Sequence, residues 1–384
     1  MKIATLLGTL SIAVSLVGAA ANGTKCVMYL TGQHVVFPPK NLASSITHVI
    51  MAFLRSDVFL PEEPPEEYPL FMPVEEVRTH FESDTKVTVA IGGWGDNDGW
   101  QVAARTRESR KKWAEQVKVM VDRTGADGID IDWEYPGGNR DDYKEVHNSE
   151  RVWEIEAFVK LLQQLRRTLG KNKLLTVATP GQEVDLIAYT HKTVPRIIQE
   201  VDFINVMTYD LMTRRYNTTN HHSGIQQSRD SIQRYMDRGA PAEMLNLGLG
   251  YYVKWFYTTD ECSPEDPIGC PTLLLEDPKT GADLGRTGGF SWHDEVPEDV
   301  VDSFARAQAD GIYTEDGSYG YWDEKELLWW TFDTPKSIAQ KMYELVHGME
   351  LGGVFAWGLG EDAPAWSHLT ATVEGLECEE KEEL

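Results

Sequence analysis

Eight short runs of β-branched and apolar residues recur along the chain of 384 residues, and each is followed by a helical or loop segment. Such alternation is typical of a parallel β-sheet, whose strands need long crossover connections. Eight parallel strands also close a barrel, and barrels of this length commonly form one domain with insertions. We therefore predict an α/β fold, the (β/α)8 TIM barrel. The expected strands cover residues 26–30, 47–53, 86–92, 128–134, 174–178, 203–209, 245–250 and 353–357.

The interval between the seventh and eighth expected strands, residues 251–352, is too long for a simple connection. A barrel needs only one helix there, with two loops of about 2 to 6 residues. The interval also contains many aromatic residues between Trp255 and Trp322, enough to pack a small core. We expect a folded subdomain over residues 254–325, with the barrel formed by residues 22–253 and 326–376.

The two ends of the chain have the features of sorting signals. Residues 1–21 combine a charged start, an apolar stretch and three alanines, which predicts a secretory signal peptide. The stretch is shorter than the roughly 20 apolar residues of a membrane-spanning helix, so we expect a secreted, extracellular protein without a membrane anchor. Residues 377–384 form an acidic tail that ends in Lys-Glu-Glu-Leu. This ending resembles the Lys-Asp-Glu-Leu retrieval signal, so retention in the endoplasmic reticulum is the alternative location.

The formal net charge of -25 and the isoelectric point near 4.8 restrict the partners of the chain. Nucleic acids and anionic membranes would be repelled, so neither is expected to bind. A neutral or cationic substrate meets no such repulsion. We expect the protein to be a monomer.

Four cysteines in a chain with a secretory signal can form two disulfides. Cys262 and Cys270 enclose a turn-rich loop that a local bridge would hold. Cys26 opens the first expected strand and Cys378 follows the last expected helix. These two places meet at the bottom of a barrel, so we expect the second pair there. Asn217-Thr-Thr is a glycosylation sequon in a polar loop.

The fourth expected strand carries three acids at alternate positions, Asp130, Asp132 and Glu134. Because side chains alternate between the two faces of a strand, the three carboxyl groups share one face. Carboxylates this close raise one another's pKa values, so at least one should keep a proton near neutral pH and act as an acid. The alternatives are an acidic edge strand and a calcium loop. The isoleucines and tryptophan between the acids favour a sheet, and we interpret the acids as catalytic.

Other candidate residues lie where barrel strands are expected to end, which is where barrel enzymes place their active sites. Glu134 ends the fourth strand, residues 207–210 end the sixth and Trp357 ends the eighth. A flat indole can stack against the apolar face of a sugar. His221 and His222 are adjacent but have no third ligand nearby, so we predict no metal site, and we expect no cofactor.

The spacing of Asp127, Asp130, Asp132 and Glu134 resembles the D-x-x-D-x-D-x-E signature of the family 18 glycoside hydrolases, the chitinase family. The resemblance implies a structural role for Asp127 within the motif. One branch of this family carries a small α+β insertion subdomain between strands seven and eight, where it forms one wall of a deep cleft. The long interval 251–352 is similar to that insertion, which the endo-N-acetylglucosaminidase branch generally lacks.

The resemblance also implies a pocket for an acetamido group. Residues 207–210 are similar to the family's strand-six motif, in which Tyr209 and Asp210 would contact this group. Trp357 would form the floor beneath the sugar. The residues expected to bind substrate are Tyr29, Phe53, Gly93, Trp94, Tyr135, Met207, Asp210, Tyr252 and Trp357.

Two positions depart from the family's pattern. Ala90 stands where a Ser-x-Gly-Gly motif usually has serine, and Lys254 stands where the segment after strand seven usually has arginine. Lysine keeps the positive charge but lacks the forked donor geometry of arginine. Any contact made there should therefore differ from the family's.

In this family the substrate itself takes part in the cleavage of its glycosidic bond. The resemblance therefore implies a single protein acid at the scissile bond. Glu134 would protonate the glycosidic oxygen while the 2-acetamido oxygen attacks the anomeric carbon. An oxazolinium intermediate and a retained configuration would follow. Asp132 would orient the acetamido nitrogen, Tyr209 would donate to the acetamido oxygen, and Asp130 would share a proton with Asp132.

The sequence therefore predicts a secreted chitinase that hydrolyses β-1,4-linked N-acetylglucosamine polymers, with chitin or chito-oligosaccharides as its partner. Two alternatives stay open. A chitin-binding lectin of the same fold typically lacks one of the signature acids, whereas all are present here. An endo-β-N-acetylglucosaminidase acting on N-glycans generally lacks the insertion.

Overall fold

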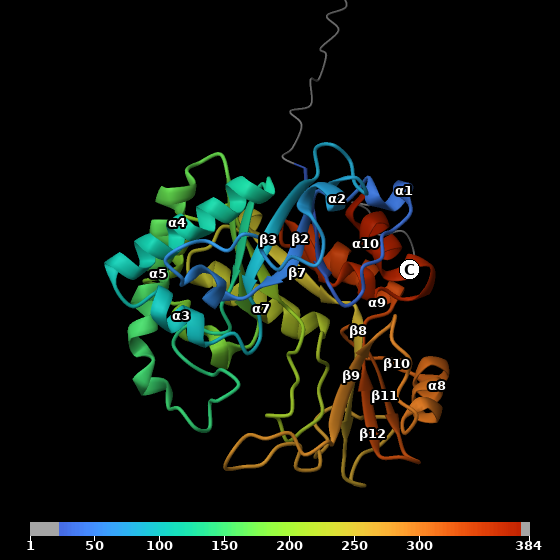
Figure 1. Ribbon diagram of the computed structural model, residues 1–384. Helices are drawn as coiled ribbons and strands as arrows, with labels where there is room; N and C mark the ends of the chain where they lie inside the picture. Colours follow the sequence, from blue (N-terminus) through green and yellow to red (C-terminus); the bar gives the residue numbers. More distant parts are fainter. Residues whose placement is uncertain (1–22, 378–384) are drawn as a thin grey trace, which may run out of the picture.

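The computed structural model describes residues 23–377, which form a closed barrel with a second sheet attached (Figure 1). The barrel order is β1-β13-β7-β6-β5-β4-β3-β2, and neighbouring strands are parallel. The predicted (β/α)8 barrel is confirmed. The expected signal peptide, the tail after residue 377 and Cys378 lie outside the described residues. The barrel strands are β1 (Lys25–Thr31), β2 (His48–Leu54), β3 (Lys86–Gly92), β4 (Gly128–Asp132), β5 (Leu174–Pro180), β6 (Phe203–Met207), β7 (Leu245–Gly250) and β13 (Gly353–Trp357).

Strands β4 and β6 end two residues before the predicted positions, at Asp132 and Met207. Asp132 still pairs with β3, and its carbonyl oxygen accepts a hydrogen bond of 2.8 Å from the Gly93 backbone N–H. Beyond these strand ends the chain leaves the sheet. Glu134 and Tyr209 therefore project from the loops that follow the strands, and the prediction that they lie within strands was wrong.

The alternation of side chains along the strands creates two separate apolar layers. On β1, Val27 and Tyr29 belong to a cluster inside the barrel, together with Phe355 of β13. Met28 and Leu30 belong to the larger layer between the strands and the helices. The acids of β4 share the inner face, so they lie in an interior that is otherwise mainly apolar.

Helices cover the outside of the barrel (Figure 1). The longest are α4 (Arg107–Thr124) and α5 (Val152–Leu169), which pack against one another. The apolar stripe of α5 is buried, and the helix ends at Gly170, whose φ of 78° favours glycine. The other helices are α1 (Lys40–Ala43), α2 (Val74–Arg78), α3 (Asp98–Ala103), α6 (Val194–Ile197), α7 (Ile225–Asp237), α8 (Val301–Asp310), α9 (Pro335–Lys341) and α10 (Ser367–Glu377).

The insertion forms a five-stranded antiparallel sheet in the order β10-β11-β12-β8-β9. Helix α8 packs on this sheet, and Phe290, Phe304 and Trp330 lie in the core between them. The predicted α+β subdomain is thereby confirmed, while the limits predicted for it, 254 and 325, stay a prediction. The strands are β8 (Tyr252–Tyr257), β9 (Thr287–Ser291), β10 (Ile312–Tyr313), β11 (Tyr319–Asp323) and β12 (Leu328–Thr331).

None of the helices between residues 23 and 377 is long and apolar enough to cross a membrane.

A buried ion pair holds the loop that follows β4. The Arg140 guanidinium lies 2.5 Å from the Glu154 carboxylate on α5, and both side chains are almost fully buried. The same Glu154 oxygen accepts a hydrogen bond of 3.0 Å from the Gly137 backbone N–H. This loop begins at Trp133, directly after β4, and it carries Glu134. The ion pair therefore fixes the chain on which the last acid of the signature stands.

Replacing Arg140 by methionine should leave Glu154 buried without its cation. A buried charge that loses its partner costs about 3–5 kcal/mol of unfolding free energy. Urea unfolding of Arg140→Met should therefore show a lower midpoint than that of the wild type. The double variant Arg140→Met/Glu154→Met removes both charges and should recover most of the loss. A single variant with the wild-type midpoint would contradict this account.

Candidate active site

The acids of β4 form a buried column inside the barrel. Asp130 is fully buried, and its carboxylate accepts hydrogen bonds from the hydroxyl groups of Tyr29 on β1 (2.8 Å) and Thr176 on β5 (2.5 Å). Asp132 is the next residue on the same face, and 3% of it is exposed. Among residues 23–377, no hydrogen bond reaches its Oδ1 atom. The protein thus holds Asp130 on both oxygens and leaves Asp132 with an unused acceptor.

Burial raises the pKa values of all three carboxyl groups in the column. The pKa of Asp130 rises to about 6, although hydrogen bonds from the two hydroxyl groups oppose this shift. For Asp132, burial and the charges of Glu134 and Asp130 raise the pKa well above its usual value. Burial also raises the pKa of Glu134 to about 7. The column therefore keeps a proton near neutral pH, as a general acid requires.

Asp127, the first acid of the signature, lies apart from the column, just before β4. Its Oδ2 atom accepts hydrogen bonds from the Arg78 guanidinium (2.7 Å) and from the Val87 backbone N–H (2.8 Å). These contacts join the end of α2, the start of β3 and the turn before β4. Asp127 is not among the residues that line the cleft described next.

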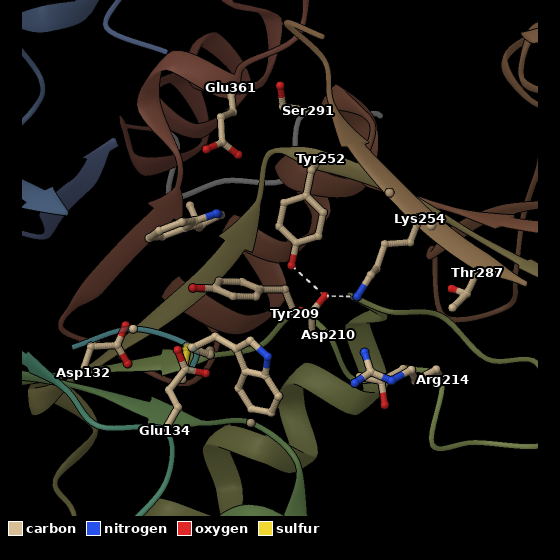
Figure 2. Close-up of a pocket in the computed structure, with 18 of the residues that line it drawn as sticks. Asp132, Glu134, Tyr209, Asp210, Arg214, Tyr252, Lys254, Thr287, Ser291 and Glu361 are labelled. Carbon is tan, nitrogen blue, oxygen red and sulfur yellow. Dashed lines mark hydrogen bonds and ion pairs between the residues drawn. The ribbon is translucent and has the colours of Figure 1, made fainter. Parts of the chain in front are cut away.

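A cleft of about 840 Å³ opens at the C-terminal ends of the barrel strands, and β9 of the second sheet contributes to one wall through Thr287, Phe290 and Ser291 (Figure 2). Most of the residues expected to act on a substrate meet there, whereas Tyr29 and Asp130 lie beneath the cleft and do not line it. The expected residues that line it are Phe53, Gly93, Trp94, Asp132, Glu134, Tyr135, Met207, Tyr209, Asp210, Tyr252 and Trp357.

Asp210 stands at the centre of a polar group on the cleft wall (Figure 2). Its Oδ1 atom accepts hydrogen bonds from the Tyr252 hydroxyl (2.8 Å) and the Lys254 ammonium (2.6 Å). Burial alone would raise the pKa of Asp210, yet the charge and hydrogen bond of Lys254 bring it below its usual value. Asp210 is therefore a fixed anion. Lys254 contacts only the Oδ1 atom of this carboxylate among the described residues.

Aromatic rings form the floor of the cleft. The Phe53 ring stacks on Trp357 with centroids 5.4 Å apart, and Tyr29 lies 5.7 Å from Trp357. Gly93 has a φ of 92°, and a Cβ atom built there would stand 2.8 Å from the Phe53 ring, so only glycine fits. Trp94 is half exposed and lines the cleft. The cleft thus offers flat apolar surfaces beside the acids, as sugar rings require.

Several cleft residues were missed by sequence reasoning. The Gln182 side chain donates a hydrogen bond of 2.5 Å to the Asp210 carbonyl oxygen. Asp185 is almost fully buried, and burial raises its pKa to about 6 although Arg215 lies 3.6 Å away. Glu361 lines the cleft from the segment after β13. Gln182, Asp185 and Glu361 follow β5 or β13 within five residues, so extending the strand-end rule to those strands would have found them.

The two adjacent histidines are buried in the second sheet's contacts with the barrel. Burial lowers the pKa of His221 to about 4 and that of His222 to about 3. The His221 ring lies 5.4 Å from Trp329, and the His222 backbone N–H donates to the Thr331 hydroxyl. In the part of the chain that the structure describes, no group of three or more His, Cys, Asp or Glu residues is arranged to hold a metal ion.

Cys26, Cys262 and Cys270 are present as thiols. Burial, followed by the neighbouring Cys270 thiol, raises the pKa of Cys262 to about 12, so these two side chains are close to each other. The expected Cys262–Cys270 bridge stays a prediction. So does the pairing of Cys26 with Cys378, which lies outside the described residues. Asn217 is exposed, so a glycan attached there would extend into solvent.

Comparisons with known proteins agree with this geometry. The model of the glycosyl hydrolases family 18 matches residues 25–362. Chitotriosidase-1 of Mus musculus is 26% identical over 367 residues, which cover 90% of this chain and 74% of that protein. Across four such curated relatives, the matched part spans between 12% and 74% of the relative's length.

Solved structures share the fold. A chitinase from Rhizomucor miehei superimposes with a TM-score of 0.73 at 18% identity, covering 91% of this chain and 99% of that one. A mutant of catalytic domain 2 of the Group II chitinase from Ostrinia furnacalis, in complex with (NAG)5, has a TM-score of 0.70 at 20% identity and covers 92% and 97%. At these identities the likeness establishes the architecture alone. Because the family model covers most of its length, the chain belongs to the glycosyl hydrolases family 18.

Proposed function

We propose that the protein is a chitinase that hydrolyses β-1,4 bonds between N-acetylglucosamine units. The observation that carries the proposal is the buried acid column, which leads to Glu134 in a cleft floored by Trp357. A proton donor beside an aromatic platform is what cleavage of a sugar polymer needs. The family and the names of the relatives support chitin as the polymer. The relative solved with (NAG)5 supports a chito-oligosaccharide as the bound partner.

In the proposed reaction, Glu134 gives its proton to the glycosidic oxygen, and the bond from that oxygen to the anomeric carbon breaks. The 2-acetamido oxygen of the sugar attacks the same carbon from the opposite face. An oxazolinium ion forms, with its positive charge shared between nitrogen and carbon. Glu134, now ionised, removes a proton from water while the water oxygen attacks the anomeric carbon. The bond from that carbon to the acetamido oxygen then breaks, which restores the acetamido group. The two inversions retain the anomeric configuration.

The neighbours of Glu134 have supporting roles in this proposal. The unused Oδ1 atom of Asp132 is free to accept the acetamido N–H, and the negative charge of Asp132 stabilises the developing cation. Asp130 lies behind it and shares the proton that both pKa shifts imply. Tyr209 lines the cleft, and its hydroxyl group donates a hydrogen bond to the acetamido oxygen. The reacting sugar therefore has to carry an N-acetyl group.

Secretion and a monomeric state belong to the same proposal, and both rest on the sequence. The expected signal peptide, residues 1–21, lies outside the described part of the chain. Microsequencing of the protein exported by a eukaryotic host would give a mature end near residue 22 if the signal is cleaved as expected.

The two alternatives make different demands on the site. A chitin-binding lectin would bind without cleavage, yet the three acids of the column are present, and burial raises their pKa values as catalysis requires. An endo-β-N-acetylglucosaminidase would release glycans from a glycoprotein. The second sheet contributes Thr287 and Ser291 to the cleft wall, which favours a long polymer over a branched glycan. Products from colloidal chitin and from a glycoprotein distinguish the two enzymes.

Replacing Glu134 by glutamine should remove the general acid. Loss of such a group lowers kcat by about 10²–10⁴-fold, which a fluorogenic chitobioside assay would measure. In the native state the pKa of Glu134 is about 7, whereas its usual value, which applies to the unfolded chain, is 4.5. The free energy of unfolding therefore falls as pH rises between these two values. Glu134→Gln should therefore melt no lower than the wild type at pH 8. Wild-type protein that binds chitin but releases no fluorophore would favour the lectin.

Activity should decline on the alkaline side of neutrality. Glu134 works as an acid only when protonated, and its protonated fraction falls as pH rises through the pKa of about 7. Above that value, kcat/KM should fall about tenfold per pH unit. Burial and Asp294 raise the pKa of Glu361 to about 7 as well, so the Glu361→Gln variant is the control. The decline should persist in that variant, and its disappearance would assign it to Glu361 instead.

Replacing Tyr209 by phenylalanine should remove the donor to the acetamido oxygen. Because this hydrogen bond holds the acetamido oxygen in line with the anomeric carbon, its loss should lower kcat by about 10²-fold while KM changes little. The Tyr252→Phe variant is a matched control, since its hydroxyl contacts Asp210. Equal losses of kcat in both variants would contradict the specific role of Tyr209.

A further inference from the structure

Glu361 is a buried carboxyl group in the cleft that the proposed reaction does not use. It follows β13 by four residues, and only 6% of it is exposed. Its Oε1 atom would stand 3.2 Å from a Cβ atom on Gly358, the residue after Trp357. In Figure 2 its carboxyl group points into the cleft, with Tyr252 and Tyr209 lying between it and Glu134. Glu361 thus faces a different part of the cleft from the acid column.

The Glu361 carboxyl is unpaired within the part of the chain that the structure describes. Among residues 23–377, neither a hydrogen bond nor an ion pair reaches its carboxyl oxygens, and its pKa is raised by burial and by Asp294. A carboxyl group that is nine-tenths buried and unpaired is costly, since burial removes the water that would stabilise its charge. The free protein limits this cost by holding the Glu361 proton up to a pKa of about 7, and a cationic ligand would instead favour the ionised carboxylate.

The basic side chains of the cleft do not pair with the Glu361 carboxyl, because each already lies beside another carboxylate. One example is His34, whose Nε2 atom lies 3.1 Å from the Asp294 carboxylate. Asp294 also accepts a hydrogen bond from the Ser291 hydroxyl. The basic residues that line the cleft are His34, Arg55, Arg214, Arg215 and Lys254, and each has a carboxylate other than Glu361 within 3.7 Å.

The missing group is therefore a positive charge on the substrate itself. Within a chitin chain, the only unit that carries one is a glucosamine whose acetyl group has been removed, leaving an ammonium on C2. The sugar on Trp357 cannot be that unit in the proposed reaction, because its acetamido oxygen is the nucleophile. An ammonium bound at Glu361 would form a charge-assisted hydrogen bond with this carboxyl group.

We propose that Glu361 forms a subsite for a glucosamine unit, so that the polymer cut in the cleft is partially deacetylated chitin. The inference rests on the proposed chitinase activity and adds to it a second requirement. One unit has to be acetylated, at Trp357, and a unit elsewhere in the cleft is preferred without its acetyl group. Fully deacetylated chitosan is then not a substrate.

The test compares two substrates of equal length, a fully acetylated chito-oligosaccharide and one that is partly deacetylated. The readout is the ratio of kcat/KM on the second substrate to that on the first. Glu361→Gln keeps the shape of the side chain and should lower this ratio about tenfold, the factor expected for a charge-assisted contact. Glu298→Gln removes the same charge from an exposed position outside the cleft and should leave the ratio unchanged. A ratio unchanged in Glu361→Gln overturns the proposal.

The products of the wild-type protein give a second measurement that does not depend on a variant. Mass spectrometric sequencing should find glucosamine enriched at one fixed distance from the new chain end, and a random distribution overturns the inference. These failures differ from a failure of the proposed function. If the wild type leaves the fully acetylated chain intact, the chitinase proposal itself is wrong. If it cuts that chain without any preference for glucosamine, only the role of Glu361 is.

Discussion

The hydrogen bonds from Tyr29 and Thr176 to Asp130 are the interaction on which the rest of the site depends. They allow a carboxyl group to lie inside a barrel whose other inner residues are mainly apolar. Asp130 has hydrogen bonds on both of its oxygens, and its charge contributes to the raised pKa of Asp132. Asp132 keeps an oxygen that is free to contact a ligand in the cleft. Ala90, where the related motif usually has serine, lies opposite Asp130 in the sheet, so the two hydroxyl groups from β1 and β5 carry this task alone.

Charge is distributed unevenly along the cleft, and this gives its parts different chemistry. The acid column lies where burial favours the protonated form, whereas Asp210 is kept ionised by Lys254. Arg215 only partly offsets the burial of Asp185. A sugar polymer in this cleft would therefore meet a proton donor at Glu134 and a fixed anion at Asp210. The strongly acidic surface of the chain has no part in this arrangement, which depends on local partners.

The sequence predicted the barrel, the insertion and the acids of the column from alternation and spacing, whereas most of the other expected cleft residues followed from the family resemblance. It placed Glu134 and Tyr209 at the ends of their strands, but both lie in the loops just beyond. It could not predict that Tyr29 lies beneath the cleft, because a strand shows which face a residue takes but not how deep it lies. Nor could it find the partners of Asp210, which lie on β8, or the isolation of Glu361, since both depend on contacts between segments that are distant in sequence.

The way the second sheet joins the barrel has a mechanical consequence. Only Tyr251 separates β7 of the barrel from β8 of the subdomain, and this residue is fully buried. There is thus no linker at this junction to act as a hinge. Tyr252 and Lys254, which hold Asp210, belong to the first strand of the subdomain. Any load that a polymer places on this wall would therefore pass through these two side chains to Asp210, the residue after Tyr209.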